Sequence, residues 1–275
     1  MRALDRKMER LRGIIGSMGS AAVAFSGGTD STLVAKVARQ ELGSRSLAVT
    51  IASPLFPASE LAQAKAVARR IGIEHIVLRL DPLKEKSFVA NRPDRCYLCK
   101  LGDFMEIIAV AKERGLDNVV DGSNVDDSED FRPGAKAKEE LGVRSPLAEA
   151  GMAKADVRAA SKLLGLPTST KGSSPCLASR IPYGEEITKD KLGMIEDAED
   201  FLKGLGFRDV RVRVHGNIAR IEVSPGQLKR LSSDPVRAKT TKRLKALGFA
   251  YVTLDMEGYR MGSLNEVLRA STTIH

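Results

Sequence analysis

The sequence predicts an α/β protein in which a doubly wound, mostly parallel sheet is joined to a smaller α+β C-terminal domain. Two observations support this class. Short apolar runs alternate with amphipathic helical patterns through most of the chain, which is typical of a parallel sheet with helices on both faces. After about residue 180 the pattern changes to a long helix and strands of alternating polarity. We therefore expect one domain over residues 1–180 and a second over residues 181–275.

The first domain is expected to contain four short strands, at residues 21–25, 47–51, 75–80 and 118–124, the last including its turn. Helices are expected between these strands, at residues 31–43, 59–72 and 100–115. Each strand is a short apolar run, whereas each helix has apolar residues at a spacing of three or four. This order predicts βαβ units, whose strands run parallel.

The C-terminal domain is predicted to begin with a helix over Lys189–Leu205 and to continue with a β-hairpin. In VRVRVHGNIARIEV, residues 210–223, valines alternate with Arg211 and Arg213, and Gly216-Asn217 is a turn signal. The alternation places both arginines on one face of the strand. Two helical stretches and a strand, YVTLD, follow.

Composition limits the classes of function. The chain of 275 residues has 43% hydrophobic and 29% charged residues and no apolar run long enough to span a bilayer. Its N-terminal residues are charged throughout, unlike a signal peptide, so we expect a cytoplasmic protein without a membrane partner. The net charge of +9 suits an anionic partner, either nucleic acid or a phosphorylated small molecule. The absence of Trp, with 4% aromatic residues, disfavours a single-strand binder.

The stretch AFSGGTDST, residues 24–32, predicts a phosphate-binding loop. A strand ends at Phe25, glycines allow a tight turn, and a helix begins near Ser31 with free N–H groups and a positive dipole end. Asp30 would repel a bare phosphate, but it is well suited to hold a Mg²⁺ ion that bridges phosphate oxygens. The alternative is a helix N-cap preceded by a glycine-rich turn.

The loop is not of the Walker type, because the lysine of that motif is missing. SGGxDS instead resembles the PP-loop of the ATP pyrophosphatases, which cleave ATP between its α- and β-phosphates. Ligands in such folds lie beyond the carboxyl ends of the strands. The residues expected to bind ATP are Ala24, Ser26, Gly27, Gly28, Thr29, Asp30, Ser31, Thr50, Ile51 and Gly122. Ala52 is expected near the adenine, and Asp126, Asp127 and Arg132 are expected to line the same site.

Three cysteines are present. Cys96 and Cys99, in DRCYLCK, are expected at the start of a helix, which would help to stabilise thiolates, and Cys176 lies in a Gly-, Ser- and Pro-rich loop. A structural disulfide does not suit a reducing compartment, and a zinc site usually needs four protein ligands. A redox pair would be expected in a different βα context. Three thiolates are enough to hold three irons of a [4Fe-4S] cluster and leave the fourth open. Three unconnected, mostly buried cysteines remain the alternative.

Three stretches together, AFSGGTDS, VRVRVHGNIARIEV and PCLASRIPYG, resemble the LarE-type PP-loop sulfur transferases over nearly the whole chain. These enzymes make the sulfur ligands of a nickel-pincer nucleotide cofactor, and their fold is of the adenine nucleotide alpha hydrolase type. The resemblance implies that a carboxylate of pyridinium-3,5-biscarboxylic acid mononucleotide is adenylated by ATP. Sulfur then displaces AMP and leaves a thiocarboxylate. A homo-oligomer is also implied.

The resemblance implies roles for single residues. In one branch of the family Cys176 would donate its own sulfur and become dehydroalanine. In the other, which this chain resembles more closely, Cys96, Cys99 and Cys176 would hold a [4Fe-4S] cluster that receives sulfide from an outside source. Arg211 and Arg213 would contact the substrate phosphate or carboxylates, and Glu222 would orient an arginine or bind metal. Arg180 would stabilise charge on the adenylate, so that Cys176, Asp30 and Arg180 are the expected catalytic residues.

Two other functions remain open at this stage. A tRNA thiolase would use the same adenylation chemistry, and the basic charge favours it, although no RNA-binding appendage is evident. A protein that binds ATP without chemistry, such as a nucleotide sensor or metal carrier, is a third hypothesis. The intact Asp30 and Ser31 disfavour it.

Overall fold

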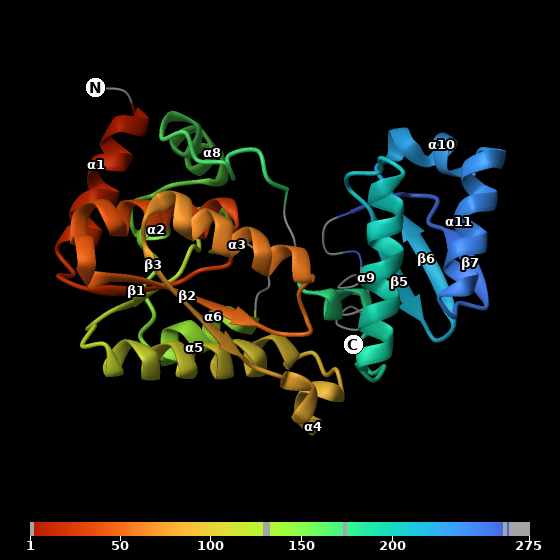
Figure 1. Ribbon diagram of the computed structural model, residues 1–275, viewed down its shortest axis with the longest axis horizontal. Coiled ribbons are helices and arrows are strands. Elements are labelled where there is room, and N and C mark those ends of the chain that lie inside the picture. Colours follow the sequence, from red (N-terminus) through yellow and green to blue (C-terminus); the bar gives the residue numbers. More distant parts are fainter. Residues whose placement is uncertain (1–2, 129–132, 173–174, 261–262, 264–275) are drawn as a thin grey trace, which may run out of the picture. The chain divides into compact units, whose positions relative to one another are not determined.

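The structure is a computed structural model that describes residues 3–128, 133–172, 175–260 and 263. The chain divides into two compact units (Figure 1). The first unit contains Met1–Pro82 and Pro93–Ser174, and the second contains Leu83–Arg92 and Pro175–His275. This division differs from the expected boundary at residue 180, because Pro175–Arg180 and an internal segment of ten residues, 83–92, both belong to the second unit.

The first unit is built on a four-stranded parallel sheet with the strand order β3-β2-β1-β4. Its strands are β1 (Ala21–Ala24), β2 (Ser46–Ala52), β3 (Glu74–Arg79) and β4 (Val119–Val120). The order changes direction next to β1, so the loop after β1 lies at the position where doubly wound folds bind ligands. The predicted parallel α/β sheet is confirmed.

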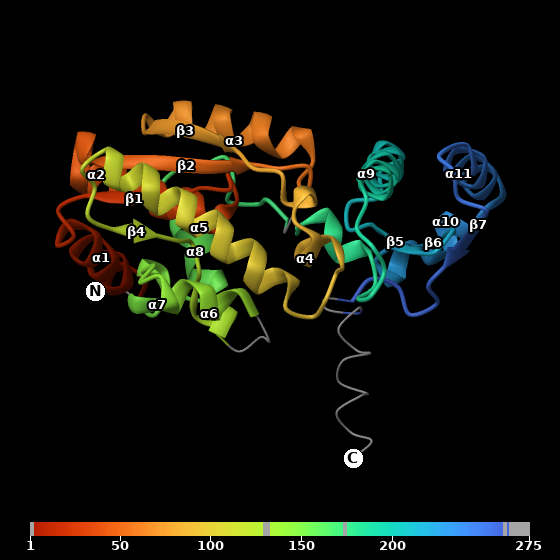
Figure 2. The same ribbon diagram turned by 90° about the horizontal axis from the view of Figure 1, so that it is seen from below.

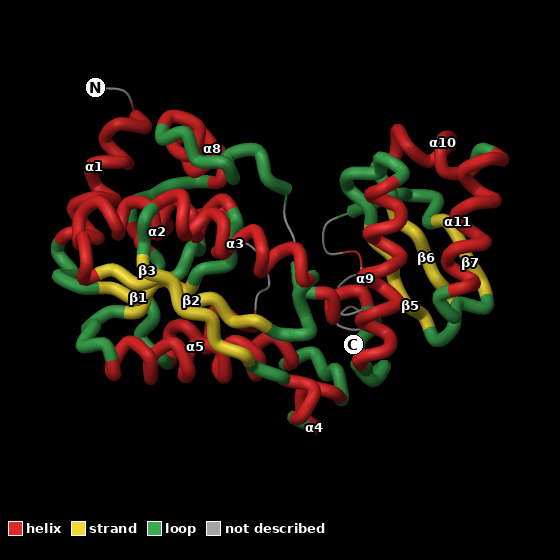
Figure 3. The backbone as a smooth tube through the Cα atoms, viewed as in Figure 1, coloured by secondary structure: helices red, strands yellow, loops and turns green. Residues whose placement is uncertain are grey.

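Helices cover both faces of this sheet (Figure 3). They are α1 (Ala3–Gly16), α2 (Thr29–Leu42), α3 (Ala58–Ile71), α5 (Arg95–Glu113), α6 (Pro133–Glu140), α7 (Pro146–Glu149) and α8 (Lys154–Leu163). Ala21 and Val23 of β1 pack with α1, α2, α3 and α8, whereas Ala22 packs with α5 on the other face. Successive strand residues point to opposite faces, and a strand that is apolar at each position is therefore buried on both sides.

The second unit contains a three-stranded mixed sheet with the order β5-β6-β7. The strands are β5 (Arg211–His215), β6 (Ile218–Glu222) and β7 (Tyr251–Leu254), and the helices are α9 (Lys189–Gly204), α10 (Leu228–Ser232) and α11 (Asp234–Ala246). β5 and β6 form the predicted antiparallel hairpin, whereas β7 runs parallel to β6 because two helices connect them. Figure 2 shows α9 and α11 on the same side of this sheet.

The internal segment Leu83–Arg92 includes α4 (Lys86–Val89), and Asn91 connects it by hydrogen bonds to the rest of the second unit. The Asn91 side chain is fully buried, and its Nδ2 donates to the carbonyls of Ile181, Pro182 and Glu185 at 3.3, 2.7 and 2.9 Å. Asn91 has a positive φ of 53°, which Asn tolerates better than most residues. The second unit is therefore assembled from two separate parts of the chain.

Among the described residues, no helix combines the length and the apolar character that crossing a membrane requires.

Candidate functional site

The loop between β1 and α2 has the shape predicted for a phosphate-binding loop. Gly27 has a φ of +68°, and a Cβ at this position would lie 2.8 Å from the Cα of Ala64 in α3. Glycine is therefore needed at Gly27 both for the backbone conformation and for the close approach of α3. The helix after the loop begins at Thr29, two residues earlier than expected, and its N-cap is Gly28. The N-terminal N–H groups of α2 thus follow the turn directly.

Two serines hold the loop in this conformation. The Oγ atoms of Ser26 and Ser31 are 3.0 Å apart, and the backbone N–H of Ser26 donates to Ser31 Oγ at 3.2 Å. The backbone N–H of Gly28 donates to Ser26 Oγ at 3.3 Å. Ser31 is buried, whereas Ser26 is exposed. The two hydroxyls therefore fix the conformation of the turn by hydrogen bonds, and Ser26 is exposed to a ligand.

Asp30 lies in the first turn of α2 and faces a lysine. Its carboxylate forms an ion pair with the ammonium group of Lys154, and its Oδ1 accepts from Asn124 Nδ2 at 3.4 Å. Lys154 is the first residue of α8, and its backbone N–H donates to Asp126 Oδ2 at 2.9 Å. The expected Mg²⁺ ligand is thus balanced by a protein cation. The pair is partly exposed, with 37% and 23% of the Lys154 and Asp30 side chains accessible, so it is weak enough to be exchanged for a bound ligand.

Gly122, in the turn after β4, is pressed against the start of α2. A Cβ at Gly122 would lie 2.7 Å from the backbone N of Ser31. We expected glycine here in order to leave room for the base of the nucleotide, whereas the structure gives packing against α2 as the reason. Asp121 fixes the same turn, because its carboxylate accepts from Ser123 Oγ at 2.6 Å and from Ser145 Oγ at 2.7 Å.

The residues expected near the adenine lie at the ends of β1 and β2. Ala24 and Ile51 are partly exposed, as is Ala52. Thr50 is buried, and its hydroxyl donates to the Phe25 carbonyl at 2.6 Å and contacts His75 Nε2 at 2.8 Å. A hydroxyl has one hydrogen, so the Thr50 oxygen accepts the N–H of His75 in the neutral tautomer that carries its hydrogen on Nε2. The Thr50 side chain therefore joins β1, β2 and β3.

Asp126 and Asp127 lie in a short 3₁₀ turn, Val125–Ser128, beside this site. Asp127 Oδ2 accepts from the backbone N–H of Asn124 at 3.0 Å, and Asp126 fixes the start of α8 as described above. Both carboxylates therefore shape the loop that carries Asn124. Arg132 lies outside the described residues.

Cys96 and Cys99 lie in the first turns of α5, as predicted, and both are partly exposed. Residues three apart on a helix lie on neighbouring positions of one face, so the two thiols are suited to share a ligand. The Arg95 guanidinium lies 4.0 Å from Cys96 Sγ, and Asp103 Oδ2 lies 4.0 Å from Cys99 Sγ. Burial raises the pKa of Asp103, although Lys100 opposes this shift.

Cys176 belongs to the second unit, whereas Cys96 and Cys99 belong to the first. Within the residues that the structure describes, no three Cys, His, Asp or Glu side chains are grouped closely enough to hold a metal ion. The cysteine pair and its basic neighbour fit two positions of a cluster site. Cys176, the third expected ligand, precedes the 3₁₀ turn Leu177–Arg180 and is partly exposed.

Arg180 holds the backbone around Cys176. Its Nη1 donates to the carbonyls of Pro175 and Cys176 at 2.8 and 3.0 Å, and its Nε and Nη2 form a bidentate pair with Glu199 at 2.8 and 2.9 Å. Only 3% of Arg180 and 2% of Glu199 is accessible. This geometry makes Arg180 a residue that positions the Cys176 loop.

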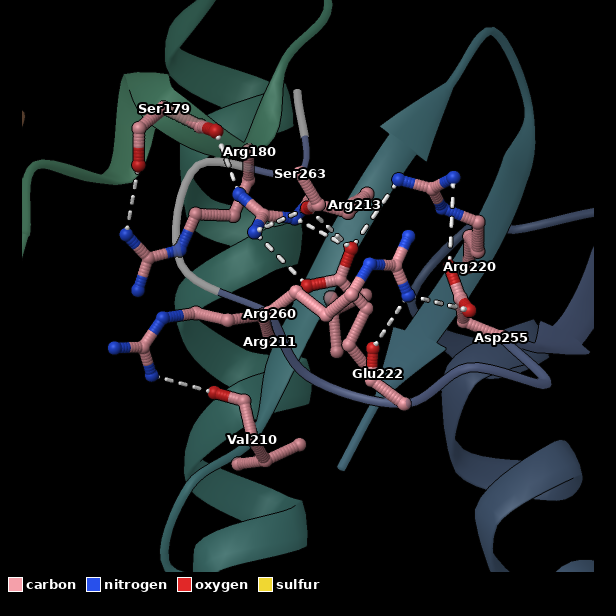
Figure 4. A network of polar contacts seen from close by, with 12 residues as sticks. Ser179, Arg180, Val210, Arg211, Arg213, Arg220, Glu222, Asp255, Arg260 and Ser263 are labelled. Carbon is pink, nitrogen blue, oxygen red and sulfur yellow. Dashed lines mark hydrogen bonds and ion pairs between the residues drawn. The ribbon is translucent and has the colours of Figure 1, made fainter. Parts of the chain in front are cut away.

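Arg213 and Glu222 form a second buried pair, on the two facing strands of the hairpin (Figure 4). Arg213 Nε and Nη2 contact the two Glu222 oxygens at 3.1 and 2.9 Å, and Arg213 Nη1 donates to the Ser179 carbonyl at 2.8 Å. Glu222 is completely buried and also accepts from Arg220 at 3.2 Å. Arg211 and Arg213 are both buried and therefore do not form a solvated surface face, and Glu222 orients Arg213.

Arg211 completes a buried group of three arginines. Its Nη1 donates to the Val210 carbonyl at 2.8 Å, and its guanidinium carbon lies 5.1 Å from the centre of the Tyr259 ring. Burial lowers the pKa of Arg211, and the positive charge of Arg180 lowers it further, although Glu199 opposes this. Three buried arginines thus share one region with two buried glutamates, and the arginines outnumber the glutamates by one. Guanidinium groups are suited to binding anions.

Sequence reasoning missed four side chains at these positions: Asn124, Lys154, Lys171 and Glu199. Lys171 contacts the Gly27 carbonyl at 3.3 Å, although 144 residues separate the two in sequence. No local pattern marks such residues, because tertiary packing alone brings them to their partners. Asn124, Lys154 and Lys171 lie in the segment between the fourth strand and the second unit, whereas Glu199 lies in α9 of the second unit.

Comparisons with known proteins agree with this geometry. Residues 17–100 match the asparagine synthase family. The chain is 38% identical, over 98% of its own length and 97% of the other, to the pyridinium-3,5-bisthiocarboxylic acid mononucleotide synthase of Lactiplantibacillus plantarum. It is 46% identical, over 96% and 99% of the two chains, to an uncharacterized protein of Synechocystis. An uncharacterized protein of Methanocaldococcus jannaschii is 33% identical over 86% of this chain and 90% of its own length.

Proposed function

The chain belongs to the LarE-type family of PP-loop enzymes, which are ATP-using sulfurtransferases, and from this premise we propose that it converts a carboxylate of pyridinium-3,5-biscarboxylic acid mononucleotide to a thiocarboxylate. The observation that carries the proposal is the phosphate loop at the start of α2, in a chain that matches such a synthase over nearly its full length. The product named for the relative requires this chemistry.

Adenylation would take place at the loop. The substrate carboxylate attacks the α-phosphate of ATP, the bond to the β-phosphate breaks, and pyrophosphate leaves. The N–H groups at the start of α2 and the Ser26 hydroxyl are placed to receive phosphate oxygens. Asp30 is the candidate Mg²⁺ ligand, and its pairing with Lys154 supports a site for positive charge there. If Asp30 held Mg²⁺, the ammonium group of Lys154 would be available to a phosphate oxygen.

The buried arginines support an anionic substrate. A nucleotide with one phosphate and two carboxylates brings several negative charges, and guanidinium groups bind such groups through paired hydrogen bonds. Arg211 and Arg213 are the proposed substrate contacts. Glu222 holds Arg213 in place, and Glu199 and Arg180 hold the segment before it. Under this proposal the effect of Arg180 on the adenylate is indirect, because Arg180 holds the backbone at Cys176 in place.

Sulfur would be transferred in a second step, in which a sulfur nucleophile attacks the acyl carbon and AMP leaves. Cys96, Cys99 and Cys176 are the proposed ligands of a [4Fe-4S] cluster, which would supply sulfide from an external source. The chain passes from the second unit to the first after Arg92, shortly before Cys96 and Cys99. It returns to the second unit after Ser174, shortly before Cys176. In the alternative, the Cys176 thiolate attacks the acyl carbon of the adenylate and AMP leaves. Loss of the Cys176 Cα proton to a base and cleavage of its Cβ–S bond would then release the thiocarboxylate and leave dehydroalanine.

The deciding experiment compares single Cys→Ala variants at the three positions, purified without oxygen and assayed for iron, sulfide and thiocarboxylate. If the cluster is used, each of the three variants loses iron and repeated turnover, and the mass of the wild-type chain is unchanged after the reaction. If Cys176 is sacrificed, only the Cys176→Ala variant is inactive, and the wild-type chain loses the elements of H₂S. Full activity in all three variants contradicts both routes.

A tRNA thiolase is the second candidate, and the net charge of +9 favours it. Binding of tRNA whose affinity falls steeply with salt, together with thiolated tRNA as product, would identify this activity. If tRNA does not bind at low salt while the pyridinium nucleotide is thiolated, the tRNA candidate is excluded.

A further inference from the structure

Lys171 is distant from the phosphate loop in sequence, but its side chain contacts the glycine turn of that loop. Its Nζ donates to the Gly27 carbonyl at 3.3 Å and forms an ion pair with Glu60 Oε2 at 2.7 Å. Only 13% of the Lys171 side chain and 23% of the Glu60 side chain is accessible. The ammonium group is therefore largely removed from solvent and is bonded to a carboxylate of α3 and to a backbone carbonyl of the loop.

The surroundings of Lys171 are themselves held in place. Glu60 lies in the first turn of α3, and this helix packs so closely on the loop that a Cβ at Gly27 would lie 2.8 Å from a Cα of the helix. The Thr29 hydroxyl donates to the Thr168 carbonyl at 2.7 Å, and both residues are buried. The segment that carries Lys171 is thus attached to the start of α2, and all of these parts belong to the first unit.

The Gly27–Gly28 peptide is a part of the loop for which such a partner matters. Neither residue has a Cβ to restrict its backbone, so the peptide between them can rotate more easily than most. In a trans peptide the carbonyl and the N–H point in opposite directions, and no cis peptide occurs in the described residues. A rotation that turned the Gly27 carbonyl away from Lys171 would therefore also turn the Gly28 N–H away from its acceptor.

The acceptor of the Gly28 N–H is the Ser26 hydroxyl, at 3.3 Å, and Ser26 is exposed. This N–H therefore points to the same side of the loop as the hydroxyl that a phosphate can reach. We propose that Lys171 is a positioning residue for ATP, which holds the Gly27 carbonyl so that the Gly28 N–H stays directed toward the phosphates. Its charge also polarises the peptide and strengthens the N–H as a donor. This inference rests on the proposed binding of the ATP phosphates at the loop.

Calorimetric titration of the full chain with ATP and Mg²⁺ tests the inference. In Lys171→Met the peptide can take both orientations, and the apparent Kd rises in inverse proportion to the fraction that is competent to bind. We expect the Kd to rise about tenfold, which corresponds to about one chain in ten in the competent orientation. Lys171→Arg keeps a cation that can donate to the carbonyl, and its Kd should lie within about threefold of wild type.

The variant Glu60→Gln separates positioning from a direct contact with phosphate. If Lys171 acts through the Gly27 carbonyl, loss of the ion pair loosens the ammonium group, and the Kd for ATP should rise. If Lys171 binds a phosphate itself, removal of the competing carboxylate should lower this Kd or leave it unchanged. An unchanged or lower Kd in Glu60→Gln thus overturns the inference, even where Lys171→Met folds poorly.

The kinetics of AMP formation give a second criterion. The full chain is given ATP, Mg²⁺, sulfide and the pyridinium nucleotide. Saturating ATP selects the competent orientation, so in Lys171→Met the KM for ATP should rise while kcat stays within about threefold of wild type. Lys162→Met, at an exposed position in α8, should leave both constants unchanged.

Two results for Lys171→Met overturn the inference: a wild-type Kd for ATP, or a loss of kcat without a change in KM. Failure of the proposed function has a different signature. A wild-type chain that binds ATP but forms no thiocarboxylate refutes that function, whereas the titrations still decide the role of Lys171.

Discussion

At the scale of single residues, Asp30 has one partner in the structure and a different partner in the proposed reaction. In the structure its carboxylate is paired with the ammonium group of Lys154, and in the proposed reaction it binds Mg²⁺. The start of α8 is fixed because the backbone N–H groups of Ala153 and Lys154 donate to carboxylates. The Lys154 backbone is therefore held, whereas its side chain is partly exposed. In the proposed reaction Lys154 would exchange Asp30 for a phosphate oxygen without movement of α8.

This exchange predicts the behaviour of Lys154→Met. A charge-assisted hydrogen bond contributes about 1.5–3 kcal/mol, so the Kd for ATP with Mg²⁺ should rise at least about tenfold. The free energy of unfolding should change by less than about 1 kcal/mol, because the ion pair is partly exposed. Calorimetric titration and urea unfolding measure the two quantities. Lys162→Met, in the same helix, is the control for both, and an unchanged Kd in Lys154→Met contradicts the exchange.

At the scale of elements, the ends of β1, β2 and β3 are joined by Thr50 and His75. Thr50 donates to the Phe25 carbonyl and accepts from His75 Nε2, and the Phe25 and His75 rings pack edge to face at 5.6 Å. Burial lowers the pKa of His75, and the charge of Lys65 lowers it further. The strand ends that carry the candidate nucleotide site therefore depend on a histidine that is held neutral.

The lowered pKa of His75 predicts a pH dependence of stability. Unfolded His binds a proton near pH 6.5, whereas the folded protein binds it only at lower pH. The unfolded state thus holds more protons below about pH 7, and the free energy of unfolding should fall as the pH drops from about 7.5 to 5.5. Urea unfolding across this range should show a shallower fall in His75→Gln.

His215 has to be considered in the same experiment, because burial and the charge of Arg220 also lower its pKa. The variant with Gln at both His75 and His215 should be less sensitive to pH than either single variant. A His75→Gln profile with the same slope as wild type would contradict the role of this residue.

At the scale of the whole molecule, the second unit is assembled from two parts of the chain, and Asn91 joins them. Its amide reaches three carbonyls in the segment after the Cys176 turn, and the backbone N–H of Gly184 donates to the Asn91 carbonyl at 3.0 Å. The short segment before the CxxC pair and the segment after Cys176 are therefore held together within one unit.

Substitution of Asn91 should weaken the second unit through these hydrogen bonds. Asn91→Gly keeps the positive φ but leaves buried carbonyls without a donor, at a cost of about 1–3 kcal/mol. Asn91→Ala should cost more, because alanine is also strained at this φ. Urea unfolding of the full chain gives both free energies. Equal stability of Asn91→Gly and wild type would show that the amide contacts contribute nothing.

Much of the architecture and of the candidate site was predictable because its signals are local. The apolar runs of β1–β4, the helical spacing between them and the arginine hairpin are each readable in a window of a few residues. The loop from Ser26 to Ser31 and the position of Cys96 and Cys99 at the start of a helix were predictable for the same reason.

The parallel sheet, the glycine-rich loop after β1 and the arginines of β5 can be predicted from the sequence alone, since each depends on neighbours along the chain. The folded structure was needed to show that Lys154 balances Asp30, that Lys171 contacts the Gly27 carbonyl, and that Glu199 pairs with Arg180. It also decided that residues 83–92 belong to the second unit. These contacts join residues that are distant in sequence, and their partners are set by how helices pack and by where buried charges find opposite charges.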